Sequence, residues 1–156
     1  MKRILTNLAL AASFCFAPAE AFSAEVQFIG RLIITAASGT CPNDPIGQRV
    51  FARWRPAGVG TNPANSTLAI FRTTQAVHYN LDAASFDATL RAVETTVITG
   101  DAGPLNYTAK VAFSNIDPQT IGATTEFINV TGRIRGFDFM PGCVANFRLA
   151  AVKRVD

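Results

Sequence analysis

The sequence is poor in the residues that most enzymes use for chemistry. Only one of its 156 residues is histidine, and charged residues make up 16%, against roughly a quarter of a typical globular chain. The lone His78 leaves no second imidazole for a metal cluster, and neither a G-x-S-x-G nor an H-E-x-x-H motif occurs. The length is that of one domain, which excludes separate cofactor and substrate modules. We therefore predict a protein without catalytic residues, metal or cofactor.

Glutamate is scarce as well, since Glu25, Glu94 and Glu126 are the only glutamates of residues 22–156. Glycoside hydrolysis needs two carboxylates that face each other. Glu94 and Glu126 would meet this requirement only if their strands were neighbours. A hydrolase is therefore the least favoured of the functions that the sequence allows.

The first residues have the pattern of a secretory signal peptide. Lys2 and Arg3 precede an apolar segment over 4–17, and Pro18 ends it. This segment of about 14 residues is shorter than the roughly 20 that a membrane-spanning helix needs. Small residues that suit a signal peptidase follow it.

We predict that residues 1–21 are removed, with cleavage between 21 and 24, and that residues 22–156 form a single exported domain. Its location would be the periplasm or the outside of the cell. No later stretch is long and apolar enough to form a transmembrane segment.

Two cysteines, Cys41 and Cys143, remain after removal of the signal segment, which contains Cys15. An even number of cysteines in an exported chain indicates a disulfide. Two buried free thiols are the alternative. A zinc site is disfavoured, because it needs closely spaced ligand pairs. We predict a Cys41–Cys143 disulfide.

The predicted mature chain has little net charge but an unusual choice of cation. It holds 12 basic and 10 acidic residues, and ten of the basic residues are arginine. A net charge of +2 is too small to indicate nucleic acid as a partner. Arg53 with Arg55, and Arg133 with Arg135, each share a strand face at a spacing of about 7 Å.

These four arginines are the candidate anion-binding residues, because guanidinium groups suit carboxylates and sulfates. The partner would be an acidic polysaccharide or another component of the cell envelope. The alternative is that the arginines cover a solvated sheet face and discourage edge pairing.

Apolar and polar residues alternate with a period of two along almost the whole chain, which is typical of half-buried strands. Clusters of Gly, Pro, Asn and Asp separate these segments and indicate turns. Residues 82–94 also fit a helix, although 86–99 reads better as a strand. The seven expected strands cover 26–36, 49–55, 67–81, 86–99, 107–114, 128–135 and 145–151.

About seven short strands predict an all-β fold, either an antiparallel β-sandwich or, as the alternative, a closed β-barrel. The disulfide would place the end of the first strand beside the start of the last, so these two strands would be antiparallel. Seven strands in simple up-and-down order would leave them parallel. Either an eighth strand or a crossover connection is therefore needed.

The function favoured by the sequence is that of an exported, non-enzymatic binding or structural module. A β-barrel that binds a small ligand in its interior is the alternative. Twelve phenylalanines could line such a cavity or could fill a core.

Overall fold

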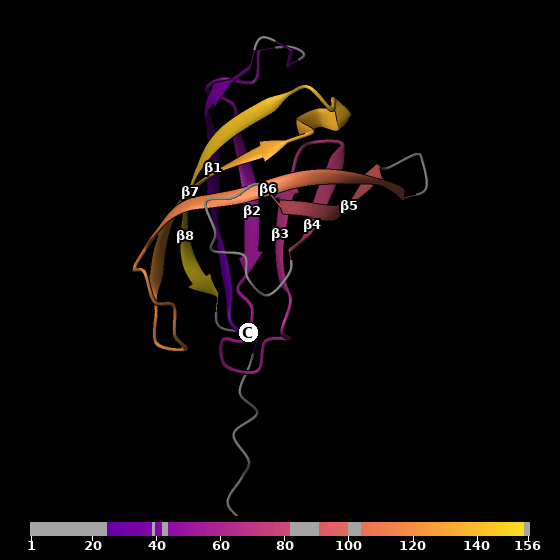
Figure 1. Cartoon of the computed structure of the whole chain (residues 1–156). Helices are drawn as coiled ribbons and strands as arrows, with labels where there is room; N and C mark the ends of the chain where they lie inside the picture. The colour runs from indigo at the N-terminus through magenta and orange to yellow at the C-terminus, as the bar shows by residue number, and fades with distance from the viewer. Residues whose placement is uncertain (1–24, 39, 42–43, 82–90, 100–103, 155–156) are drawn as a thin grey trace, which may run out of the picture.

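The computed structural model describes residues 25–38, 40–41, 44–81, 91–99, 104–154. The predicted signal segment lies outside the described residues, and so does most of the ambiguous segment 82–94. Strand and turn dominate the rest, as the alternating pattern predicts (Figure 1). The elements in chain order are β1 (Gln27–Ala37), β2 (Arg49–Arg55), β3 (Ser66–Phe71), β4 (Gln75–Leu81), β5 (Arg91–Thr99), β6 (Leu105–Asp117), β7 (Phe127–Arg135), the short 3₁₀ turn η1 (Phe137–Phe139) and β8 (Val144–Arg154).

The strands form a closed antiparallel barrel in which each strand pairs with the next, and β8 pairs with β1. This confirms the all-β prediction and its barrel alternative, whereas the sandwich is wrong. The difference arises in residues 67–81, where the alternating pattern predicts one strand. They form β3 and β4, joined by a turn at Arg72–Thr74 in which the Arg72 amide donates to the Gln75 carbonyl at 2.8 Å. The additional strand makes the first and last strands antiparallel without any crossover.

The interior of the barrel is filled by side chains from alternate positions of the strands. Trp54 is fully buried and lies 6.1 Å from the ring of Phe28 and 5.7 Å from that of Phe113. Phe113 in turn meets Phe147 edge to face at 6.1 Å. An eight-stranded barrel is just wide enough for side chains to fill it. At the level of these four rings the interior is therefore filled by side chains.

Gly132 permits this packing on β7. A side chain there would place its Cβ 2.4 Å from the Ala112 carbonyl oxygen and 2.7 Å from the Phe147 ring. Both distances are shorter than the contacts that Cβ atoms make in proteins. The nearer obstacle is a backbone atom, which can shift only at a high cost in free energy. The glycine therefore lets Phe147 occupy the centre of the barrel.

Candidate functional site: an arginine ridge

Most arginines of the domain gather on one side of the barrel. Eight of the ten arginines in residues 22–156 lie on the four neighbouring strands β7, β8, β1 and β2, at positions that alternate with buried residues. Their side chains therefore point outward. They are Arg31, Arg49, Arg53, Arg55, Arg133, Arg135, Arg148 and Arg154.

The register places four of these arginines in a diagonal line across the four strands. Arg53 is opposite Ile29, two residues before Arg31 on the same strand. Arg31 is opposite Ala150, two residues after Arg148. Diagonal neighbours of this kind lie about 7–8 Å apart.

Arg148 continues the line onto β7, because it is opposite Thr131, two residues before Arg133. Arg55 and Arg135 extend it at its two ends, each two residues further along its strand. Five steps of about 7 Å give a row of cations about 35 Å long. We call this row the arginine ridge: Arg55, Arg53, Arg31, Arg148, Arg133 and Arg135.

The two arginine pairs singled out in the sequence are thus not neighbours. Arg53 and Arg55 belong to β2, whereas Arg133 and Arg135 belong to β7, and the strands β1 and β8 lie between them. Arg31 and Arg148 connect the pairs. The periodicity of single strands could not reveal this connection, since it depends on the register between strands.

No carboxylate occupies an outward position on these four strands, all of which the structure describes. Among the described residues, acidic groups form ion pairs at the margins of this side, where Glu25 contacts Arg55 at 3.4 Å and Glu126 contacts Lys153 at 3.5 Å. In the described part of the chain, no ion pair joins Arg31, Arg49 or Arg148 to an acidic residue. The guanidinium groups at the centre of the ridge are therefore available to an external anion.

The opposite side of the barrel has a different charge pattern. Among the side chains that the structure describes on β3–β6, the charged ones are Glu94, Lys110 and Asp117, and none is an arginine. The cations are thus concentrated on one half of the barrel. A concentration of one sign raises the local density of counter-charged ligands.

The remaining carboxylates do not form a catalytic pair. Glu94 is opposite Thr108 on β6, whereas Glu126 immediately precedes β7, where Asn129 is opposite Asp117. Thr108 and Asp117 are nine residues apart on β6, which corresponds to about 30 Å. Glu94 and Glu126 therefore lie at opposite ends of the barrel.

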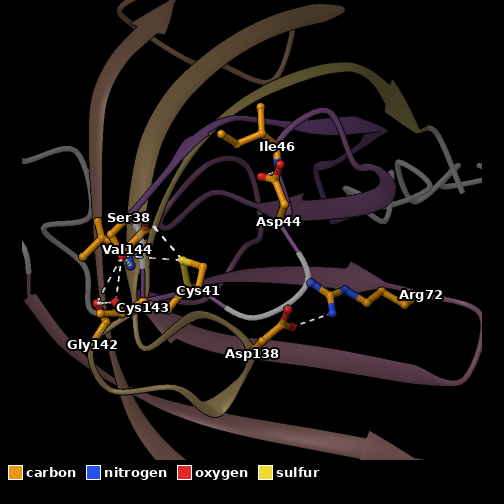
Figure 2. The surroundings of a disulfide bond; sticks show 10 residues. Ser38, Cys41, Asp44, Ile46, Arg72, Asp138, Gly142, Cys143 and Val144 are labelled. Carbon is orange, nitrogen blue, oxygen red and sulfur yellow. Dashed lines mark hydrogen bonds and ion pairs between the residues drawn. A yellow bond between two sulfur atoms is a disulfide. The ribbon is translucent and has the colours of Figure 1, made fainter.

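The disulfide predicted from the sequence is present and ties the β1–β2 loop to the residue before β8 (Figure 2). The Cα atoms of Cys41 and Cys143 are 4.5 Å apart. Beside it, the hydroxyls of Ser38 and Thr40 both donate to the Gly142 carbonyl. The disulfide and these hydrogen bonds fix the β7–β8 loop at this end of the barrel.

Contacts between Arg72 and η1 also stabilise this end of the barrel. Arg72, which the alternating pattern places within a strand, lies in the β3–β4 turn and forms an ion pair with Asp138 (Figure 2). Its guanidinium group also packs over the Phe137 ring at 4.9 Å. Inside, the fully buried Tyr79 hydroxyl is hydrogen-bonded to Tyr107, and burial raises the Tyr79 pKa well above its usual value. The Tyr107 pKa is raised as well, again chiefly by burial, so both phenols stay neutral at physiological pH.

His78 lies on the outer side of β4, where it contacts the Phe71 ring edge to face at 6.2 Å. Burial, and then the charge of the nearby Arg53, lower its pKa below 6.5. The folded state therefore favours neutral His78, whereas the unfolded chain binds a proton more readily.

This difference predicts that the protein loses stability as the pH falls from about 6.5, the pKa of an unperturbed histidine, to the lower pKa of His78 in the folded state. Melting temperatures measured between pH 7.5 and 5.0 should show this decline. A His78→Gln variant should show a shallower decline, because its side chain does not titrate. Parallel curves for the two proteins would contradict this role of His78.

No family model matches this chain, and no match was found among curated proteins or solved structures. No helix within the described ranges is long and apolar enough to cross a membrane. The arrangement of side chains is therefore the basis on which a function can be assigned.

Proposed function

We propose that residues 22–156 form an exported, non-enzymatic binding module that holds an anionic component of the cell envelope or its surroundings on the arginine ridge. The observation that carries this proposal is the arrangement of outward arginines on four neighbouring strands without a carboxylate among them. A surface that serves solubility alone usually mixes both signs of charge.

The chemistry of the ridge suits anions that present flat, paired oxygens. A guanidinium group forms two parallel hydrogen bonds to a carboxylate or sulfate and is less strongly hydrated than an ammonium group. Neighbouring cations at about 7 Å also repel one another mildly, and a bound polyanion would relieve this repulsion. A chain of repeating acidic units is therefore a better match than a single ion.

Two further observations support an exported protein. The N-terminal sequence has the features of a signal peptide, and disulfides such as Cys41–Cys143 persist mainly in oxidising compartments. Both agree with a ligand located outside the cytoplasm.

The proposal predicts that the mature domain binds dextran sulfate, and that replacing the two central arginines weakens binding roughly tenfold or more. This magnitude follows if each lost charge-assisted contact is worth about 1 kcal/mol at an exposed site. The measurement is titration calorimetry of wild type and the Arg31→Gln/Arg148→Gln variant at low salt. Affinity should also fall as salt rises, because exposed charges are screened over about 8 Å at physiological ionic strength.

A Lys110→Gln/Lys153→Gln variant is the matched control, since it changes the net charge equally but leaves the ridge intact. It should bind dextran sulfate almost as tightly as wild type. Circular dichroism should show that both variants are folded. Equal weakening in the two variants, or no binding by wild type at low salt, would contradict the proposal.

A further inference from the structure

The arginine ridge passes a depression on the outer surface of the barrel, near the β7 end of the ridge. The depression has a volume of about 510 Å³ and lies over β6, β7, β8 and β1. Irregularities in two of these strands accompany it, since β6 has a register shift between Phe113 and Asn115, and β1 has one between Ile34 and Ala36. The polar residues that line it are Thr35, Ser114, Thr131, Arg133, Asn146 and Arg148.

The lining combines two kinds of polar group. Arg133 and Arg148 can only donate hydrogen bonds, whereas the hydroxyls and the Asn146 amide can both donate and accept. The hydroxyls of Ser114 and Thr131 lie 3.1 Å apart and are paired with each other. A simple anion would use only the arginines. A ligand that matches the whole lining carries an acidic group together with neutral groups, such as hydroxyls, that both donate and accept hydrogen bonds.

We infer that this depression is a subsite for one uronic-acid residue of an acidic polysaccharide, which continues along the ridge. The sugar carboxylate would contact Arg133 and Arg148, and its hydroxyls would exchange hydrogen bonds with Thr131, Asn146 and Ser114. This inference rests on the proposed function and specifies the ligand class.

A lipid headgroup fits the depression less well. The large exposed apolar residues on the strands of this side are Phe51, Phe127 and Val152. Phe127 and Val152 form a row with Arg53, and Phe51 is opposite Arg31. None of the three lines the depression. Phe147, the apolar side chain in the lining, is 1% exposed. A membrane would therefore find its apolar contacts away from the depression. The barrel surface is also convex, which suits a flexible chain better than a flat bilayer.

A second depression on the other side of the barrel provides a comparison. It is lined by Glu94, Thr96, Asn106, Tyr107 and Thr108, and the Thr96 hydroxyl donates to the Asn106 amide oxygen at 2.9 Å. It thus also contains threonine hydroxyls and an asparagine amide, but it has a carboxylate in place of the arginines. The same substitutions can therefore be made in both depressions without any change of charge.

The experiment compares polygalacturonate with poly-L-glutamate of similar length, which carries carboxylates but no hydroxyls. Wild type should bind polygalacturonate about tenfold more tightly than polyglutamate at the same salt concentration, as expected from two additional neutral hydrogen bonds. A Thr131→Val/Asn146→Ala variant should lose this preference and bind polyglutamate as wild type does. The matched Thr96→Val/Asn106→Ala variant should keep the preference.

Equal binding of the two polymers by wild type would overturn the sugar-acid assignment while leaving a general anion-binding ridge intact. Loss of the preference in the control variant would also overturn the sugar-acid assignment. So would vesicles of phosphatidylglycerol that, at matched charge, displace polygalacturonate more readily than polyglutamate, because the depression would then bind lipid headgroups. Absence of binding to every polyanion, dextran sulfate included, would instead refute the proposed function. Melting curves of both variants would exclude unfolding as the cause of a lost preference.

Discussion

Loss of the Cys41–Cys143 disulfide is expected to lower the melting temperature by roughly 10–20 °C. The two cysteines are 102 positions apart in the chain, and closing a loop of that length removes about 4–5 kcal/mol of conformational freedom from the unfolded state in the entropic model. For a domain of this size each kcal/mol corresponds to roughly 2–4 °C. A Cys41→Ala/Cys143→Ala variant compared with the oxidised wild type measures the effect.

Reduction provides the control for this experiment. Dithiothreitol should lower the melting temperature of wild type and leave that of the double variant unchanged. Because Cys143 is fully buried, the extent of reduction must be checked by thiol titration in denaturant. A fully reduced wild type that melts at the temperature of the oxidised protein would contradict the prediction.

Replacement of Trp54 by alanine is expected to destabilise the fold by about 3–5 kcal/mol, the usual cost of removing a large buried aromatic side chain. Trp54 contacts Phe28 and Phe113 across the interior, and its indole N–H donates to the Ser66 hydroxyl at 2.8 Å. The alanine variant loses these ring contacts and leaves a cavity at the centre of the barrel. Urea unfolding followed by circular dichroism measures the loss.

A Trp54→Phe variant separates packing from hydrogen bonding. It retains an aromatic ring but removes the donor to Ser66, whose own hydroxyl still donates to the Arg55 carbonyl at 2.9 Å. Its destabilisation should therefore be clearly smaller than that of the alanine variant. If both variants lost the same stability, the ring contacts would not be the main contribution of Trp54.

The strand content of the fold could be predicted from the sequence because inward and outward residues alternate so regularly. The number of strands could not, because the turn at Arg72–Thr74 contains neither glycine nor proline. The choice between sandwich and barrel depended on the same turn, since one additional strand allows β1 and β8 to pair directly. The disulfide was predictable from the even number of cysteines in a chain for which the sequence predicts export.

Only part of the candidate site could be predicted from the sequence. The spacing of Arg53 with Arg55 and of Arg133 with Arg135 reveals a shared face within one strand. Arg31 and Arg148 join these pairs only through the register of β1 with its two neighbours. No pattern within a single strand contains that information, because it is set by the way in which the barrel closes.

The pairing of β1 with β8 has a consequence for how the chain reaches its folded state. Ten residue pairs join these two strands, yet β1 is synthesised first and β8 last. Until β8 is available, both β1 and the growing sheet present an unpaired edge, the kind of edge to which other strands can add. Such long-range pairing is intrinsically slow. Pairing of β8 with β1 is therefore the step at which association between incomplete chains would compete with folding. The cationic side chains of β1 and β2 would oppose such association, because the same charges on two chains repel each other.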